Sequence, residues 1–260
     1  MRGRLINHRL LDDRLIHDRQ INDARQHLIV ALDVSSAAAA RKIVAAVGDS
    51  ASTYKIGMQL YTAEGPQLVR ELVASGRRIF LDLKYHDIPT TVASAVREAA
   101  KLGVSMLTVH ASGGSKMLRG AVEAAASVNP ELVVLGVTVL TSMDEHDLEE
   151  AGARDKILEQ VLRLADLAIR SGCQGIVTSA RETAQVRSRL GHKFAIVNPG
   201  IRPAGADRGD QSRVVTPAEA IAAGATHIVV GRPITEAANP AAEAEKILHE
   251  MRPVAVSSGR

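Results

Sequence analysis

From Leu28 onward, short apolar runs rich in β-branched residues alternate with Ala- and Leu-rich segments that carry their charges on one side. Each apolar run has the length of a strand, and each segment between the runs has the spacing of an amphipathic helix. Strands that alternate with helices form parallel βαβ units, because each helix carries the chain back to the start of the next strand. The predicted strands are 28–33, 53–57, 78–83, 105–110, 132–139, 174–179, 193–198 and 226–231.

Eight units of this size close naturally into a barrel, and the 260-residue chain matches the roughly 250 residues typical of such a domain. We therefore predict an α/β protein with a single (β/α)8, or TIM, barrel over residues 27–252. A doubly wound open sheet is the alternative. We expect residues 1–26 to be an N-terminal extension, helical or flexible, and residues 253–260 to be a C-terminal tail.

Helix boundary signals occur where this arrangement needs them. Ser36, Pro89 and Thr216 each precede or open an Ala-rich segment, as N-cap residues and N-terminal prolines do. Gly103 and Gly224 follow two of these segments, as glycines at helix C-termini do. The longest interval between strands contains the acidic stretch MDEHDLEEAG, where we expect an additional helical turn.

Composition and charge favour an aliphatic core and a nearly neutral barrel. The chain is 46% hydrophobic but has only 2 Phe, 3 Tyr and no Trp. Residues 1–26 contain six Arg and four Asp, so they carry two of the three net positive charges. A nucleic-acid or anionic-membrane surface would need a clustered basic face, and we therefore expect neither partner.

Cysteine usage and hydropathy suggest the compartment. Cys173 is the only cysteine, which excludes an intrachain disulfide and fits a reducing cytoplasm. We expect it to be a small buried hydrophobic side chain. The chain has no apolar run of 18 residues and no secretory h-region, so we expect a soluble, cytoplasmic protein.

Candidate chemistry collects at the predicted strand ends, which is where barrel enzymes place their catalytic groups. The strongest local signal is FLDLKYHDIPTT, in which Asp82 and Lys84 are two residues apart on a strand and should point to the same side. Two carboxylates and an ammonium within six residues are costly to bury unless they compensate one another. They suit a reaction in which a lysine donates a proton while aspartates hold it and shape the field around a developing negative charge.

The motif DLKYHDIP at residues 82–89 resembles the signature of the orotidine 5'-monophosphate decarboxylase family. The resemblance covers roughly residues 27–250 and continues through LIVALD, YKIG, TVHASGG, VTVLTS, NPGIRP and VVGRPIT, in order and at barrel-like spacing. Asp-x-Lys-x-x-Asp alone is shared with sugar-phosphate decarboxylases and aldol-type synthases of the same barrel group. The combination with the other motifs is much more specific.

The resemblance implies conversion of orotidine 5'-monophosphate to uridine 5'-monophosphate and CO2, the last step of de novo pyrimidine nucleotide synthesis, with no cofactor and no metal. It implies that Lys84 protonates pyrimidine C6 and that Lys55, Asp82 and Asp87 complete a charged array. It also implies a homodimer in which Asp87, Ile88 and Thr91 reach the neighbouring active site.

The resemblance implies substrate contacts as well. Asp33 and Lys55 would bind ribose hydroxyls, and Thr141 or Ser142 would face the pyrimidine. For His110, at the end of the fourth predicted strand, we favour a hydrogen-bonded structural role.

A substrate phosphate needs donors, and the loops after strands 7 and 8 are the usual place for them in such barrels. Gly231 would let backbone N–H groups approach a phosphate, and Arg232 follows it. Pro199, Arg202 and Gln211 lie in or beside a Gly-rich polar segment. We interpret residues 200–213 as a lid that closes over the phosphate.

Two other functions stay open. A barrel relative acting on a phosphorylated keto-sugar would use Mg²⁺ held by carboxylates to stabilise an enediolate. Lys55 stands where an additional acidic ligand would be wanted, and its charge would repel a metal. A catalytically inactive nucleotide-binding barrel would be expected to have lost some of the charged residues, yet all four are present.

Overall fold

The strands form a closed parallel barrel in chain order, in which each strand pairs with its sequence neighbours and β8 pairs with β1. The computed structural model describes residues 24–203 and 215–252. The strands are β1 (Leu28–Ala31), β2 (Thr53–Gly57), β3 (Arg78–Tyr85), β4 (Met106–His110), β5 (Val133–Val137), β6 (Gly175–Val177), β7 (Ala195–Asn198) and β8 (His227–Val230).

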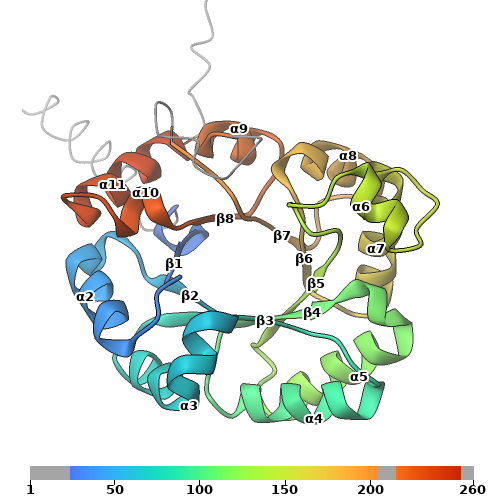
Figure 1. Ribbon diagram of the computed structural model, residues 1–260, viewed down its shortest axis with the longest axis horizontal. Coiled ribbons are helices and arrows are strands. Elements are labelled where there is room, and N and C mark those ends of the chain that lie inside the picture. The colour runs from blue at the N-terminus through green and yellow to red at the C-terminus, as the bar shows by residue number, and fades with distance from the viewer. Residues whose placement is uncertain (1–23, 204–214, 253–260) are drawn as a thin grey trace, which may run out of the picture.

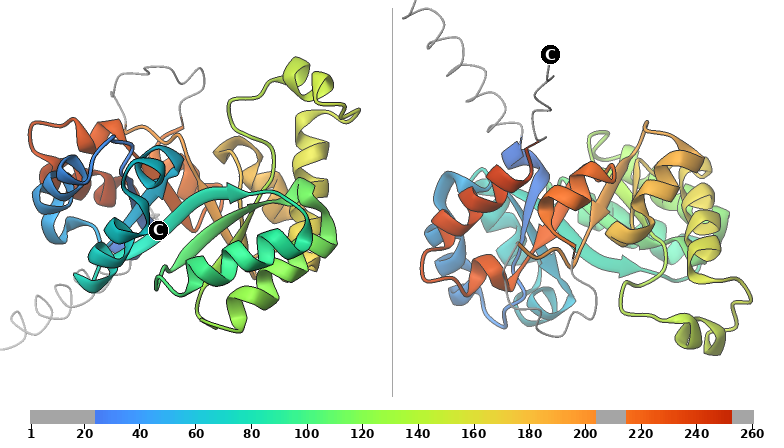
Figure 2. Two further views of the ribbon diagram at one scale, coloured as in Figure 1. Left: turned by 60° about the horizontal axis from the view of Figure 1, so that its bottom comes forward. Right: turned by 90° about the horizontal axis from the view of Figure 1, so that it is seen from above.

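The helices surround the barrel (Figure 1), and the side views show them packed along the outside of the strands (Figure 2). This arrangement confirms the predicted (β/α)8 barrel over the alternative of an open sheet. The helices are α2 (Ala37–Val47), η1 (Gly48–Ser50), α3 (Met58–Ala74), α4 (Pro89–Ala100), η2 (Ala111–Gly113), α5 (Gly114–Ala126), α6 (Glu145–Glu150), α7 (Ile157–Arg170), α8 (Ala180–Leu190), α9 (Pro217–Ala222), α10 (Arg232–Thr235) and α11 (Pro240–Glu250).

Local signals placed several helix starts correctly. The Ser36 hydroxyl accepts a hydrogen bond from the backbone N–H of Ala39 at 3.2 Å and so caps α2. Pro89 is the first residue of α4, and Thr216 caps α9 in a capping box with Glu219. The additional helical turn expected in the longest interval is α6.

The core has two parts, as the layers of a barrel require. The larger part lies between the strands and the helices and is almost entirely aliphatic. Cys173 belongs to it, and burial raises the pKa of its thiol to about 12, which fits the predicted hydrophobic role. The smaller part fills the barrel interior with side chains from alternate positions of six strands: Ile29, Ala31, Phe80, Met106, Leu135, Val197 and Val229.

The chain termini lie largely outside the described residues. Of the predicted extension 1–26, residues 24–26 are described, and Arg25 Nη2 lies 2.9 Å from Glu245 Oε1 of α11. The predicted tail 253–260 is outside. Within the described ranges, no helix combines the length and the hydropathy that crossing a membrane requires.

Candidate active site

Four charged side chains, from β2, from β3 and from the segment after β1, form a series of alternating sign: Asp33, Lys55, Asp82 and Lys84. Lys84 Nζ lies 2.9 Å from both carboxylate oxygens of Asp82. Lys55 Nζ lies 3.9 Å from Asp82 Oδ2 and 2.8 Å from Asp33 Oδ1. The side chains of Lys55 and Asp82 are only 12% and 14% exposed. Each charge therefore has a partner of opposite sign, which offsets the desolvation cost of placing it there.

The backbone of β3 is irregular where it carries this series. Regular pairing with β4 ends at Leu81 and resumes at Tyr85, so three residues of β3 face the single residue Thr108 of β4. Lys84 has a φ of 51°, in the left-handed region that favours glycine. From regular strand alternation we predicted that Asp82 and Lys84 would point to the same side. Their side chains do meet, but through a bulge and a left-handed residue.

The series borders a cavity of about 650 Å³. Phe80, Val177 and Val229 from the barrel interior give the cavity an apolar floor. An apolar cavity with a few convergent charged groups is typical of a small-molecule site. The predicted site residues that line it are Asp33, Lys55, Asp82, Lys84, Thr141, Pro199, Arg202, Gly231 and Arg232.

Two guanidinium groups belong to the β7–β8 side of the cavity. Arg202 comes shortly after β7 and is only 6% exposed. Arg232 follows Gly231 at the end of β8 and is exposed. A ligand could therefore place one anionic group near the lysines of β2 and β3 and a second near these arginines.

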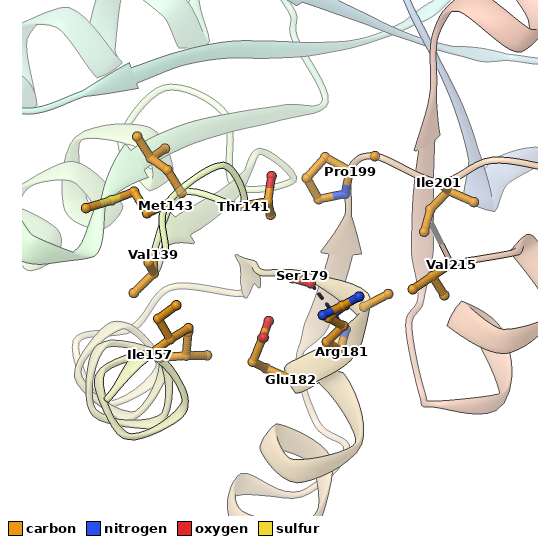
Figure 3. A pocket seen from close by; sticks show the side chains of 14 residues that line it. Val139, Thr141, Met143, Ile157, Ser179, Arg181, Glu182, Pro199, Ile201 and Val215 are labelled. Carbon is orange, nitrogen blue, oxygen red and sulfur yellow. Dashed lines mark hydrogen bonds between the residues drawn. The ribbon is translucent and has the colours of Figure 1, made fainter. Parts of the chain in front are cut away.

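A smaller cavity of about 50 Å³ lies beside the first and shares Thr141 and Pro199 with it. Figure 3 shows Ile157 on one side of this space, with Arg181 and Glu182 on the α8 side. Because Thr141 and Pro199 line both cavities, a substitution at either residue would affect both spaces.

The sequence of the barrel matches a known protein family over most of its length. Residues 26–247 match the model of the family described as Orotidine 5'-phosphate decarboxylase / HUMPS family. The chain belongs to this family. The match spans nearly the whole barrel and includes every strand that carries a residue of the charged series.

Curated relatives and a solved structure agree with this membership. Proteins named orotidine 5'-phosphate decarboxylase from Moorella thermoacetica and Halorhodospira halophila are 48% and 51% identical to this chain. These alignments cover 89% and 86% of this chain and 94% and 95% of the relatives. The crystal structure of orotidine 5'-phosphate decarboxylase from Lactobacillus acidophilus has a TM-score of 0.80 and 38% identity. That comparison covers 88% of this chain and 100% of the other.

In this family member, two histidine rings connect the loop after β3 to the end of β4. The rings of His86 and His110 are stacked, with centroids 5.4 Å apart and planes 30° apart. Burial lowers the pKa of His110 below its usual 6.5, and the charges of His86 and Lys84 lower it further. His110 is not among the residues that line the large cavity. Its predicted structural role stays a prediction, which the stacking against His86 favours.

Other predicted site residues do not line the large cavity. Asp87, Thr91 and Ser142 are exposed residues outside its lining, within the part of the chain that the structure describes. Gln211 and most of the predicted lid 200–213 lie outside the described residues.

Sequence reasoning missed one polar residue of the site. Thr108 lies inside the apolar run MLTVH, where a threonine looks like any other β-branched strand residue. Its hydroxyl nevertheless contacts both Lys84 and Asp82. No sequence signal marks it, because the contact depends on the irregular register between β3 and β4.

Proposed function

We propose that this chain is an orotidine 5'-monophosphate decarboxylase that releases CO2 and forms uridine 5'-monophosphate without a cofactor, as the last step of de novo pyrimidine nucleotide synthesis. The observation that carries the proposal is the series Lys55, Asp82 and Lys84 beside a cavity that also receives Arg232. The family membership and the names of the relatives support it.

The proposed chemistry needs a positioned proton donor. When the bond between C6 and the carboxylate breaks, the electron pair stays on C6, where no adjacent carbonyl delocalises it. The Lys84 ammonium stabilises this charge and then gives its proton to C6. Both oxygens of Asp82 accept hydrogen bonds from Lys84 Nζ at 2.9 Å, so the ammonium is held in place before the substrate binds.

The remaining contacts follow the two ends of a nucleotide. We assign Asp33 and Lys55 to ribose hydroxyls, and Thr141 or Ser142 to the pyrimidine. We assign the phosphate to Gly231 and Arg232, with Pro199, Arg202 and Gln211 on the lid side. Phosphate binding at this distance from C6 would let remote binding energy contribute to the chemical step.

We also propose a homodimer whose active sites are shared. Ile88 is 64% exposed although it is a large hydrophobic residue, and Asp87 beside it is exposed too. An exposed hydrophobic side chain next to a charged one at a strand end suits a subunit interface. In the dimer, Asp87, Ile88 and Thr91 would reach the partner's cavity.

The alternative functions are less well supported by the site. A Mg²⁺-dependent reaction on a keto-sugar phosphate would need carboxylates free to bind the ion. Lys55 Nζ instead lies between Asp33 and Asp82, at 2.8 Å and 3.9 Å, and its charge takes the place a cation would use. A non-catalytic barrel would not need so complete a charged series. We place the enzyme in the cytoplasm, because its single cysteine, Cys173, suits a reducing compartment.

The test mixes purified protein with orotidine 5'-monophosphate in the presence of EDTA and follows the fall in ultraviolet absorbance. We expect wild-type turnover that EDTA does not reduce, and no turnover by Lys84→Ala, which should still bind uridine 5'-monophosphate. Normal turnover by Lys84→Ala would refute the lysine mechanism. A reaction that EDTA abolishes would favour the metal-dependent relatives.

A further inference from the structure

We propose that Thr108 is a positioning residue for the proton donor and its aspartate, an inference that rests on the proposed decarboxylase function. Its hydroxyl oxygen accepts a hydrogen bond from the backbone N–H of Lys84 at 2.9 Å. The same hydroxyl donates to Asp82 Oδ1 at 3.0 Å. Thr108 is completely buried in β4, so no solvent competes for either bond.

The need for a hydroxyl here follows from the bulge in β3. Between Leu81 and Tyr85 the regular ladder with β4 is interrupted. A backbone N–H in such a gap must find another acceptor, because an unpaired buried donor is costly. Thr108 supplies that acceptor for Lys84. It therefore stabilises a left-handed conformation, φ 51°, that a lysine adopts only where its surroundings hold it.

The direction of the two hydrogen bonds is determined by chemistry. The Lys84 N–H can only donate, so the Thr108 oxygen must accept from it. The Asp82 carboxylate can only accept, so the hydroxyl hydrogen must point at Oδ1. One hydroxyl thus sets both the backbone of the lysine and the orientation of the carboxylate that holds the lysine's ammonium group.

The consequence should be kinetic and local. Thr108→Val keeps the shape of the side chain but removes both hydrogen bonds. A hydrogen bond to a charged group is typically worth enough to change a rate on the order of 10- to 100-fold, and we expect kcat to fall by that factor. KM and the affinity for uridine 5'-monophosphate should change less than about threefold, because the phosphate contacts we assign lie on the β7–β8 side.

The experiment compares three variants with the wild type by steady-state kinetics and by calorimetric binding of uridine 5'-monophosphate. Thr108→Ser keeps the hydroxyl and should retain kcat within about threefold. The control is Thr138→Val. Thr138 is also buried, at 3%, and its hydroxyl donates to the backbone carbonyl of Val177 at 3.0 Å and not to a residue of the charged series. It should keep kcat near the wild-type value.

Each outcome decides the inference. A large loss of kcat in Thr108→Val alone, rescued in Thr108→Ser, supports it. A Thr108→Val variant with nearly normal kcat overturns it while the wild-type activity leaves the proposed function intact. Equal losses in Thr108→Val and Thr138→Val also overturn it, because they would indicate a general effect of losing a buried hydroxyl.

Two further measurements keep the test decisive. If Thr108→Val does not fold, Thr108→Ser and Thr108→Ala give the same comparison, because these variants differ from each other only in the hydroxyl. Similar kcat values for that pair would overturn the inference. If the wild-type protein does not convert orotidine 5'-monophosphate, the proposed function is refuted, and the inference that rests on it is refuted too.

Discussion

Acid should destabilise this protein through a histidine at the amino-terminal end of the barrel, far from the charged series. His227 begins β8 and lies against His27, with ring centroids 5.0 Å apart. Burial, followed by the charges of His27 and Arg78, lowers the pKa of His227 from 6.5 to about 4. The folded protein therefore resists protonation at a site that the unfolded chain protonates readily.

The size of the effect follows from these two values. Above pH 6.5 both states are neutral at this site, and below about 4 both are protonated. As the pH falls from 6.5 to 4, only the unfolded state gains the proton, so the free energy of unfolding decreases. Each tenfold change in the ionisation constant is worth about 1.4 kcal/mol, which gives a total loss of about 3 kcal/mol. Roughly 2 kcal/mol of it should be lost by pH 5.

The assay is urea unfolding followed by far-ultraviolet circular dichroism at pH 7.5 and pH 5, at one protein concentration. His227→Gln lacks the titrating ring, so its stability should fall less than that of the wild type between the two pH values, by about 2 kcal/mol. His146→Gln is the control, because the His146 side chain is 77% exposed. If His227→Gln and the wild type lose the same stability, the linkage argument is refuted.

Three other substitutions test other parts of the structure. In Gly57→Ala the added Cβ would lie 3.2 Å from Lys55 Nζ, so we expect kcat/KM to fall about 10-fold. The stability should be nearly unchanged, because the φ of −93° at this position is one that alanine adopts without strain. Arg187→Met removes donors to the carbonyls of three residues and a guanidinium stacked on Phe194, so chemical denaturation should show a loss of about 3 kcal/mol. Arg232→Ala should raise KM and lower kcat/KM in steady-state assays, because it removes a cation from the cavity.

For each of these three predictions, one outcome would contradict the reasoning. Unchanged kcat/KM in Gly57→Ala would mean that the position of Lys55 Nζ is not critical. A fully stable Arg187→Met would mean that its carbonyl partners find other donors. A normal KM in Arg232→Ala would indicate that the substrate phosphate does not bind at the β8 end of the cavity.

Much of the fold was predictable from sequence because its signals are local. An N-cap such as Ser36 or Thr216 acts on backbone groups two or three residues away. The alternation of apolar runs with amphipathic segments likewise reflects which face each element buries. Eight such units then leave few ways to cover a parallel sheet on its outer face, and the closed barrel is one of them.

Part of the candidate site was predictable for a related reason. Parallel strands bring their carboxyl ends to the same side of the barrel, whatever lies between them in the chain. Polar residues at the ends of predicted strands therefore had to gather, and Asp33, Lys55, Asp82 and Arg232 do line one cavity. Asp87 and Thr91 also follow a predicted strand, but they are exposed and do not line this cavity.

What the sequence alone determined about this protein is the order of its elements, their boundaries within a few residues and the strand ends that carry charge. Only the tertiary structure decided the left-handed φ of Lys84, the role of Thr108 and the pairing of His27 with His227. Each of these depends on the register between two strands, or on two chain segments far apart in sequence. Hydrophobic periodicity reports which face of an element is buried, but it contains no information on how neighbouring elements are aligned along their length.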